Sequence, residues 1–237
     1  MAFNFSPKIV TDGLILCLDA ANTKSYVSGS TTWNDMSRGG NTMALVNGPT
    51  FNSNNGGSIV FDGVDDRASI TSSINTGQNF TVSAWIFPTL LGTTRRTVVA
   101  NSYIDVGTTN GWFFSTAGFG VSNTFFMSIG RDTAYRVAPA NTLSTNTWTH
   151  IVGVVQGGGS GITFYKNGVA LTTYANSLLT SVSITYTHPQ FNVGFRNVGS
   201  IETDPYTGRI AQTSIYNRAL SATEVLQNYN ATKSRYI

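Results

Sequence analysis

The stretch TGRIAQTSIYNRALSATEV, which is residues 207–225, decides the fold. Its first ten residues alternate toward one apolar face, which is typical of a β-strand. A turn then leads to Ser221, and Glu224 follows three residues later, a spacing that predicts a reciprocal capping box at the start of a helix. We therefore expect the chain to close with one strand and one short helix. The apolar side of this helix is formed by Val225, Leu226 and Tyr229.

The rest of the chain consists of short segments rich in β-branched and aromatic residues. Asn167-Gly168 lies between two alternating runs and predicts a tight hairpin, because Asn-Gly readily takes the positive φ angles of such a turn. The Gly-rich residues 156–161 predict a second hairpin loop. These features predict an all-β fold, a two-sheet antiparallel β-sandwich (jelly roll) with one short C-terminal helix. The clearest strands are residues 81–87, 147–155, 162–165 and 191–195.

Composition favours one ordered domain. The chain has 237 residues, enough for a substantial core, and its aromatic content of 12% argues against disorder. No internal linker interrupts it, so we expect an N-terminal arm at residues 1–8 and a single domain at residues 9–237. The arm carries Phe3 and Phe5. These side chains either close the domain's own sandwich or dock onto a partner.

Six motifs spread over nearly the whole chain occur in a recognisable order. They are GLILCLDA at residues 13–20, WNDMSRGGN at 33–41, SIVFDGVDD at 58–66, FTVSAWI at 80–86, WTHIV at 148–152 and FYKNG at 164–168. Together with the closing segment they resemble the LamG-like jelly-roll family, within the concanavalin A-like lectin and glucanase superfamily. The resemblance implies the same sandwich. It leaves the function open, because this fold hosts lectins, glycan hydrolases and purely structural modules.

The sequence offers no catalytic pair. Glycosidases need two carboxylates on either side of the scissile bond, and the chain has only two glutamates. Glu202 lies in a loop and Glu224 in the helix cap. His150 lies within a strand, where half-buried structural packing is the expected role, and His188 precedes a proline, which favours an extended loop. We predict that the protein is not an enzyme.

Three carboxylates surround one turn and suggest a metal site. Asp62, Asp65 and Asp66 flank Gly63, and Ca²⁺ prefers clusters of carboxylate and carbonyl oxygens. Alternatively, Asp62 braces the turn through backbone amides while the other two face water. Many relatives carry Ile-Asp-Asp-Val near the C-terminus, whereas residues 210–213 here read Ile-Ala-Gln-Thr. Calcium is the one cofactor that the sequence suggests, and the loss of both acids argues against any metal that depended on them.

Sugar binding normally requires an exposed aromatic ring. Trp85 and Trp148 alternate within apolar strands and are expected in the core, and Trp33 matches a motif residue that usually packs. Trp112 follows a predicted turn, which makes it the least constrained tryptophan. The candidate carbohydrate-binding residues are Trp112, Tyr103 and Tyr135, with packing in the interior as the alternative for Trp112.

Charge and cysteine content limit which cellular compartment and which partners can be expected. Cys17 is the single cysteine and lies among leucines, so we expect a buried apolar side chain and no disulfide within the chain. The 14 basic residues are scattered and exceed the acidic ones by only three, which argues against a nucleic acid partner. No apolar run approaches the ~20 residues of a membrane span. The first residues lack the pattern of a signal peptide, and we expect synthesis without one.

Proteins with this family signature and no signal peptide resemble small virion proteins of tailed bacteriophages. The resemblance implies a non-enzymatic virion surface protein, either a capsid decoration protein or a fibre component, made in the host cytoplasm. Its expected partners are a viral capsid or tail protein, further copies of itself in a homo-oligomer or lattice, and a host surface glycan bound weakly. The alternative is a free-standing carbohydrate-binding lectin that depends on calcium.

Overall fold

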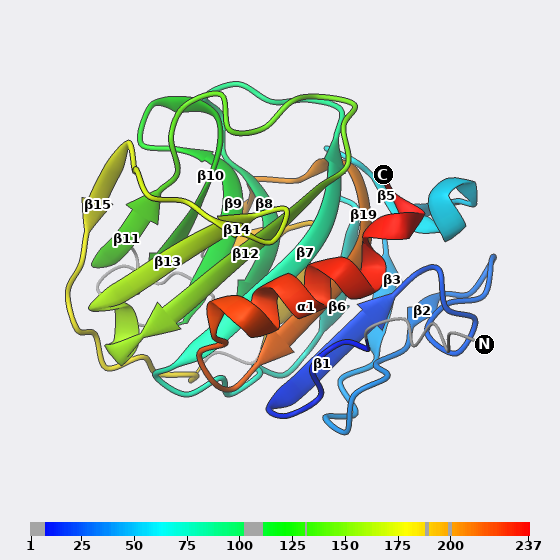
Figure 1. The fold of residues 1–237 in the computed structure, drawn as a ribbon. Helices are drawn as coiled ribbons and strands as arrows, with labels where there is room; N and C mark the ends of the chain where they lie inside the picture. The colour runs from blue at the N-terminus through cyan, green and yellow to red at the C-terminus, as the bar shows by residue number, and fades with distance from the viewer. Residues whose placement is uncertain (1–7, 102–110, 131, 188–189, 199–200) are drawn as a thin grey trace, which may run out of the picture.

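The structure is a computed structural model that describes residues 8–101, 111–130, 132–187, 190–198 and 201–237, with the backbone alone at 197–198 and 201–203. Two antiparallel sheets pack face to face in it (Figure 1). The first sheet runs in the order β14 (Val169–Ala170), β13 (Gly161–Lys166), β12 (Thr149–Gln156), β7 (Phe80–Pro88), β19 (Thr207–Tyr216), β5 (Ser58–Asp62) and β4 (Thr50–Asn52), and β1 (Leu14–Asp19) also pairs with β19.

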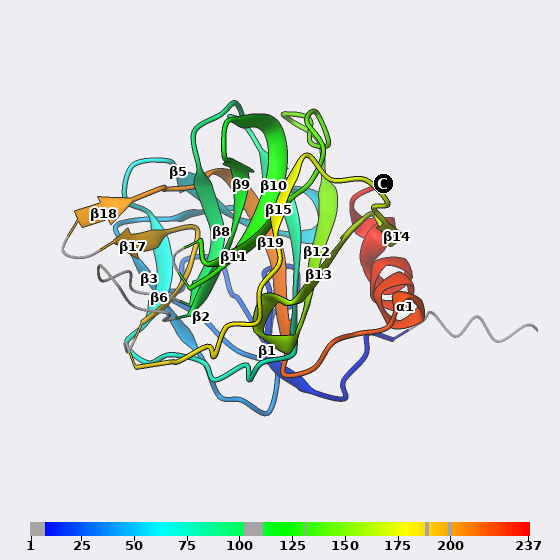
Figure 2. The ribbon, with the colours of Figure 1, turned by 90° about the vertical axis from the view of Figure 1, so that its left-hand side faces the viewer.

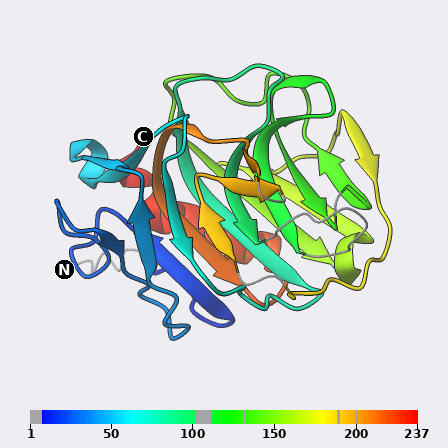
Figure 3. The same cartoon turned by 180° about the vertical axis from the view of Figure 1, so that it is seen from behind.

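The second sheet forms the opposite layer. Its order is β15 (Asn176–Leu178), β11 (Ala134–Val137), β10 (Val121–Ile129), β9 (Trp112–Gly118), β8 (Arg96–Asn101), β16 (Phe191–Val193), β6 (Arg67–Ile70), β3 (Met43–Val46) and β2 (Thr32–Trp33). A separate hairpin of β17 (Arg196–Val198) and β18 (Ile201–Thr203) lies on the outer side of this sheet, beside β8 (Figures 2 and 3). The two-sheet sandwich predicted from the sequence is confirmed.

The main core lies between the two sheets. Alternate residues of each strand point inward, as the period of two in a strand requires. The inward residues of β7 are Phe80, Val82, Ala84 and Ile86, all buried, and β9 and β10 contribute Trp112, Phe114, Phe125 and Met127. The sandwich is therefore closed by apolar side chains from both layers.

A helix covers the outer face of the first sheet. Helix α1 (Ala222–Thr232) begins with the predicted capping box: the Glu224 amide donates to Ser221 Oγ at 3.3 Å, and the Ser221 amide donates to Glu224 Oε2 at 2.8 Å. Val225 is buried and Tyr229 packs against Trp85, as expected. Leu226 was expected on the same side, but it is 43% exposed. A residue that directly follows Val225 is turned away by about 100°, so it leaves the narrow contact with the sheet.

Trp85 and Trp148 are buried, as predicted, but they lie beneath α1 rather than between the sheets. The Trp85 indole N–H donates to Thr232 Oγ1 at 2.8 Å, and its ring lies 4.3 Å from that of Tyr236. Trp148 also contacts Tyr236. The C-terminal residues, which include the 3-10 helix at Lys233–Arg235, thus complete a second, aromatic core.

The two predicted hairpins are confirmed. Asn167 and Gly168 take φ angles of 51° and 77° between β13 and β14. Gly157–Gly159 forms a 3-10 turn between β12 and β13. A further 3-10 turn at Asn54–Gly56 precedes β5.

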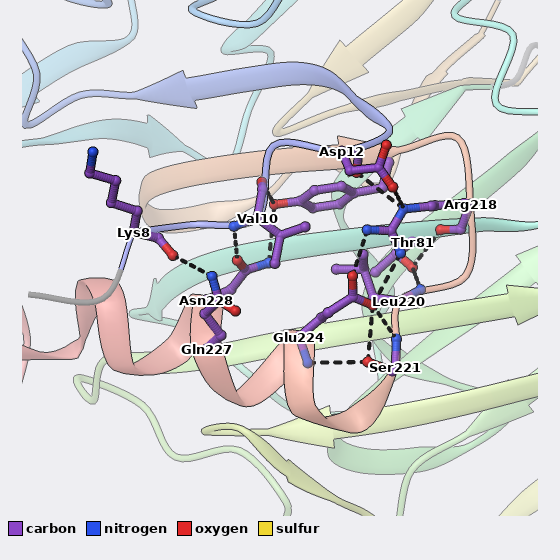
Figure 4. A network of polar contacts seen from close by, with 11 residues as sticks. Lys8, Val10, Asp12, Thr81, Arg218, Leu220, Ser221, Glu224, Gln227 and Asn228 are labelled. Carbon is purple, nitrogen blue, oxygen red and sulfur yellow. Dashed lines mark hydrogen bonds and ion pairs between the residues drawn. The ribbon is translucent and has the colours of Figure 1, made fainter.

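The first described residues are tied to the last helix (Figure 4). The Val10 amide donates to Asn228 Oδ1 at 2.8 Å, and the Gln227 side chain donates to the Lys8 carbonyl at 2.8 Å. The Tyr216 hydroxyl donates to the Val10 carbonyl at 3.0 Å. These contacts place Lys8 to Val10 against α1. The predicted docking residues Phe3 and Phe5 lie outside the described residues.

Candidate functional site

The carboxylate turn, Asp62 to Asp66, connects β5 of the first sheet to β6 of the second. Oxygens of Asp62, Asp65 and Asp66 lie within 4.8 Å of one another. Gly63 makes the turn with a φ of 84°, and a Cβ there would collide with the Thr207 hydroxyl. The chain therefore brings together all three residues of the predicted metal site.

Two of these carboxylates also stabilise the turn itself. Asp62 Oδ1 accepts from the Val64 amide at 2.8 Å, and Asp66 Oδ2 accepts from the Asp62 amide at 3.0 Å. The bracing role considered for Asp62 is thus present. Asp66 was expected to face water in that alternative, but it is only 5% exposed. Burial, followed by the nearby charges of Asp62 and Asp65, raises the pKa of Asp66.

The donor set fits a hard cation. Three carboxylates at this spacing offer oxygen ligands of the kind that calcium prefers, and their mutual repulsion would be relieved by a positive ion. The Asp65 carbonyl is already engaged, because it accepts from Asn47 Nδ2 and Arg67 Nη1, both at 3.2 Å. Side-chain oxygens would therefore supply most of the coordination.

The prediction that Trp112 contacts a sugar is wrong. Its side chain is 0% exposed, its indole N–H donates to Thr76 Oγ1 at 3.1 Å, and its ring stacks on Phe80. Trp112 is the first residue of β9, and strand alternation directs it into the core. Tyr135 lies on the outer face of the second sheet, stacked on Phe119 at 3.9 Å between ring centroids. Tyr103 lies outside the described residues.

The outer face of the second sheet carries a continuous cross-strand row, named the outer row here. Successive members are direct partners on neighbouring strands, so their side chains share one face. The outer row is Leu178, Tyr135, Ser128, Phe113, Ala100, Asn192, Ser69, Ala44 and Thr32.

Two arginines cover aromatic rings in and beside the outer row. The guanidinium of Arg95 lies 5.2 Å from the rings of Phe119 and Phe126, and that of Arg196 lies 4.1 Å from the ring of Phe113. Such contacts between a cation and a ring face are attractive. The guanidinium groups are also paired with carboxylates: Arg95 with Asp132 at 3.2 Å, and Arg196 with Asp204.

The charges within this cluster compensate one another. Burial lowers the pKa of Arg196, while the charge of Asp204 opposes that effect. The cluster contains two cations and two anions, so it has no net charge. Asp132 is fixed in turn by the Ser128 hydroxyl, which donates to it at 2.6 Å.

Asn192 is the polar member of the outer row that lacks partners. It is 0% exposed, and neither its amide nitrogen nor its amide oxygen has a hydrogen-bond partner in the structure as described. A buried polar group without a partner is destabilising by about 1–3 kcal/mol. Native structures contain few such groups, and each calls for an explanation.

A polar hollow of about 410 Å³ lies beside Asn192. Ser69, the direct cross-strand partner of Asn192, lines it, and direct partners have Cβ atoms ~4.5–5.5 Å apart. Among the described residues, the lining contains hydroxyl and amide side chains and no charged residue. Its residues are Gly40, Asn41, Thr42, Ala44, Ser69, Ile70, Thr71 and Ser72.

A buried serine–histidine pair lies on the opposite face of the molecule. His150 Nε2 and Ser83 Oγ are 2.8 Å apart. His150 was expected to be half-buried, but it is 2% exposed and packs against both Trp85 and Tyr229, and burial lowers its pKa to about 3. Its Nδ1 has no partner among the described groups, so no carboxylate orients the ring as a catalytic relay requires.

The other candidates for catalysis do not form a site in the described part of the chain. Both carboxylate oxygens of Glu224 accept from the Arg218 guanidinium, at 2.6 and 3.0 Å. These bonds, with the Ser221 amide, lower the pKa of Glu224 to about 2. His188 and the side chain of Glu202 lie outside the described residues.

The comparisons with known proteins agree with this fold. Residues 62–226 match the model of the concanavalin A-like lectin/glucanases superfamily, and the chain belongs to this family. No curated protein matches the chain. Among the described residues, no helix is long and apolar enough to cross a membrane.

Several solved structures have the same fold at low sequence identity. Domain 4 of a GH43 extracellular arabinanase from Geobacillus stearothermophilus, in complex with arabinotriose, has 19% identity and a TM-score of 0.60, over 93% of this chain and all of that one. The binding domain of Paraclostridial Mosquitocidal Protein 1 has 16% identity and a TM-score of 0.66, over 92% of this chain and 52% of that one. A mutant of Trypanosoma rangeli sialidase with trans-sialidase activity has 15% identity and a TM-score of 0.62, over 97% of this chain and 34% of that one.

The chain thus spans about a third of the length of the sialidases that it resembles. At these identities the likeness concerns the fold alone.

Proposed function

We propose that this chain is a non-catalytic carbohydrate-binding domain that holds a neutral glycan on the outer face of the second sheet. The observation that carries the proposal is the polar hollow at Ser69, which is lined by hydroxyl and amide side chains. A sugar hydroxyl both donates and accepts, so it complements side chains of this kind. Asn192 is fully buried next to Ser69 and does not itself line the hollow.

The composition of the hollow favours an uncharged sugar. Its lining offers the hydroxyls of Thr42, Ser69, Thr71 and Ser72 and, within the described part of the chain, no charged side chain. The arginines further along the face are paired with aspartates, so they leave little net charge to attract an acidic sugar. The half-buried Tyr135 and Phe119 offer stacked rings at the other end of the outer row. Support also comes from the arabinotriose complex of domain 4 of the arabinanase, which has the same fold.

Binding without catalysis is part of this proposal. The serine–histidine pair is buried beneath α1, and Glu224 is committed to Arg218 and Ser221. Calcium binding at the carboxylate turn is also part of the proposal. The carboxylate turn leads directly into β6, which carries Ser69, so an ion at Asp62, Asp65 and Asp66 would fix the strand that lines the hollow.

A binding experiment with Ser69→Ala tests the proposal. We expect the parent protein to bind at least one neutral oligosaccharide from a glycan array, with affinity confirmed by calorimetry, and Ser69→Ala to lose about fivefold in affinity, or about 1 kcal/mol, the usual worth of one hydrogen bond. Its melting temperature should change little, because Ser69 is only half-buried. Asn54→Ala, an exposed position on the side of the first sheet, is the matched control.

Two results would contradict the proposal. One is the absence of any glycan binding by the parent. The other is full binding by Ser69→Ala together with a lower melting temperature, which would show that Ser69 serves the fold.

We further propose that the domain is displayed on a virion surface, attached to a capsid or tail protein in several copies, where it binds host glycans weakly. The support for this location is the sequence resemblance to small virion proteins of tailed bacteriophages. A free-standing lectin, dependent on calcium, is the alternative. Immunogold labelling of purified particles distinguishes the two, because a free lectin would leave the particles unlabelled.

A further inference from the structure

A second hollow lies where β1 begins, and it is named the β1 hollow here. It has a volume of about 670 Å³ and is lined by residues 11–14, at the start of β1, and by residues 36–38 of a later loop. This volume lies within the range of about 300–1,000 Å³ that is usual for small-molecule sites. The described lining residues of the β1 hollow and of the polar hollow at Ser69 are all different, so the two hollows are separate candidate sites.

The loop that forms one wall of the β1 hollow is tied firmly to the strand. Asp35 accepts from the backbone amides of Cys17 and Ser37, both at 2.8 Å, and from the amide of Asn41 at 2.9 Å. The Met36 amide donates to the Cys17 carbonyl at 2.9 Å. These bonds fix the backbone of this loop against β1, so the wall has a defined shape before any ligand arrives.

The other wall is held by the segment that follows β19. The Gly13 carbonyl accepts from the Asn217 amide at 2.9 Å. The Arg218 Nε donates to the Asp12 carbonyl at 3.2 Å and pairs with Asp12 Oδ2 at 2.8 Å (Figure 4). With both walls fixed, a ligand would lose little free energy to ordering the protein.

Arg38 is the charged residue of the β1 hollow that the fold does not use. Its side chain is exposed and makes no hydrogen bond, ion pair or ring contact within the described part of the chain. Every other described arginine contacts a carboxylate, a carbonyl, another side-chain oxygen or an aromatic ring. These arginines are Arg67, Arg95, Arg96, Arg136, Arg196, Arg209, Arg218 and Arg235. A firmly held loop thus presents a free guanidinium at a hollow of ligand size.

The charges on the two walls restrict the ligand. A guanidinium binds a carboxylate or a phosphate through two parallel hydrogen bonds. Asp12, on the wall opposite to Arg38, is 85% exposed, so it would repel a phosphate with up to two negative charges more than a carboxylate with one. Asp12 can instead accept from hydroxyl groups, and Thr11 and Ser37 add two hydroxyls to the lining. One carboxylate together with several hydroxyls is the chemistry of a sugar acid.

We propose that the β1 hollow binds a uronic acid unit of an acidic glycan. The carboxylate of the sugar pairs with Arg38, and its hydroxyls donate to Asp12 and bond to Ser37. Leu14 and Met36 provide apolar contact for the C–H face of the ring. This site goes beyond the neutral-glycan site proposed above, because it lies in a different hollow and selects for a charge.

Calorimetry with trigalacturonic acid tests the proposal, at low ionic strength where charge pairs are least screened. We expect the parent to bind this probe and to bind its methyl ester, which keeps the rings but lacks the charges, at least about tenfold more weakly. Arg38→Gln should lose at least about tenfold in affinity for the acid, as expected for the loss of a charged hydrogen-bonded pair. Its melting temperature should stay the same, because Arg38 makes no described contact.

Lys24→Gln is the matched control. It removes the same charge from another exposed residue that does not line the β1 hollow, so its affinity for the acid should stay within about twofold of the parent. An equal loss in both variants would show that the overall charge of the protein attracts the probe, and would overturn the proposal.

Three further results would overturn it: no binding of the acid by the parent, equal binding of the methyl ester, or full binding of the acid by Arg38→Gln. Ser69→Ala should leave the binding of trigalacturonic acid unchanged, and Arg38→Gln should leave the binding of a neutral glycan unchanged. Failure at one hollow is therefore distinguishable from failure at the other.

Discussion

The outer faces of the two sheets differ in what covers them. The face of the first sheet lies beneath α1, where Trp85, Trp148 and Tyr236 form an aromatic core and the Trp85 N–H is bonded to Thr232. The face of the second sheet has arginines laid over phenylalanines, a polar hollow and the unpartnered Asn192. One face is completed by the chain's own C-terminus. The other carries a hollow lined by hydroxyl groups, which is why we place stability on the first face and propose binding on the second.

The largest expected effect is the loss of stability when a buried ring is removed from the covered face. Trp85→Ala removes a fully buried ring and should lower the free energy of unfolding by about 3–5 kcal/mol. Tyr135→Ala, on the second sheet's outer face, should lower it by far less, because Tyr135 is only half-buried. Urea unfolding followed by tryptophan fluorescence and circular dichroism measures both. Equal losses in the two variants would contradict the assignment of stability to the first face.

A smaller effect on the same face depends on pH. Burial lowers the pKa of His150 from 6.5 to about 3. The unfolded chain therefore binds a proton at His150 near pH 6.5, whereas the folded protein binds it only near pH 3. The free energy of unfolding is consequently highest above pH 6.5 and falls as the pH is lowered toward 3. Each pH unit within that interval should reduce the free energy of unfolding by about 1.4 kcal/mol.

The interval from pH 6.5 to 4.5 separates this histidine from Glu224. The raised pKa of Asp66 acts in the opposite direction, because the folded state then takes up a proton at Asp66 before the unfolded state does. The lowered pKa of Glu224 adds a loss of stability only as the pH falls from 4.5 toward 2. His150→Gln should remove the slope between pH 6.5 and 4.5, as measured by urea unfolding at each pH. A slope that stays the same in His150→Gln would place the titrating group elsewhere.

The smallest effect concerns the edge of the binding face. Calcium at the carboxylate turn should stabilise the folded protein by about 1.4 kcal/mol at ten times its dissociation constant, because it binds the folded state. Differential scanning calorimetry with calcium and with chelator measures this shift, and Asp65→Asn, whose side chain is not used in the turn's own hydrogen bonds to Val64 and Asp62, should abolish it. An identical melting curve in both conditions would rule out the metal site.

Features formed by residues close together in the sequence were predicted well from local patterns. The capping box of Ser221 and Glu224 and the Asn167-Gly168 hairpin involve residues at most three positions apart, so their chemistry is visible in the sequence. Trp112 could not be placed in this way. Whether it faces inward depends on the register of β9 with β8 and β10, which distant residues set.

The carboxylate turn and Asn192 show the same limit within the site. Asp62, Asp65 and Asp66 are close in sequence, and their clustering was predictable, but the burial of Asp66 was not. The alternation Phe191-Asn192-Val193 indicates that Asn192 faces away from the core. Its lack of partners depends on Ser69 and Ala100, which lie far away in the sequence.

The attachment of Lys8 and Val10 to α1 has a consequence for the orientation of the domain. Because Gln227 and Asn228 hold these residues, the chain enters on the side of the first sheet, behind the covered face. Figure 2 shows α1 and the hollow-bearing second sheet on opposite sides of the sandwich. A neighbour joined at this entry point would stand behind the domain, and the second sheet's outer face would point outward and remain open to large, branched molecules in the surroundings.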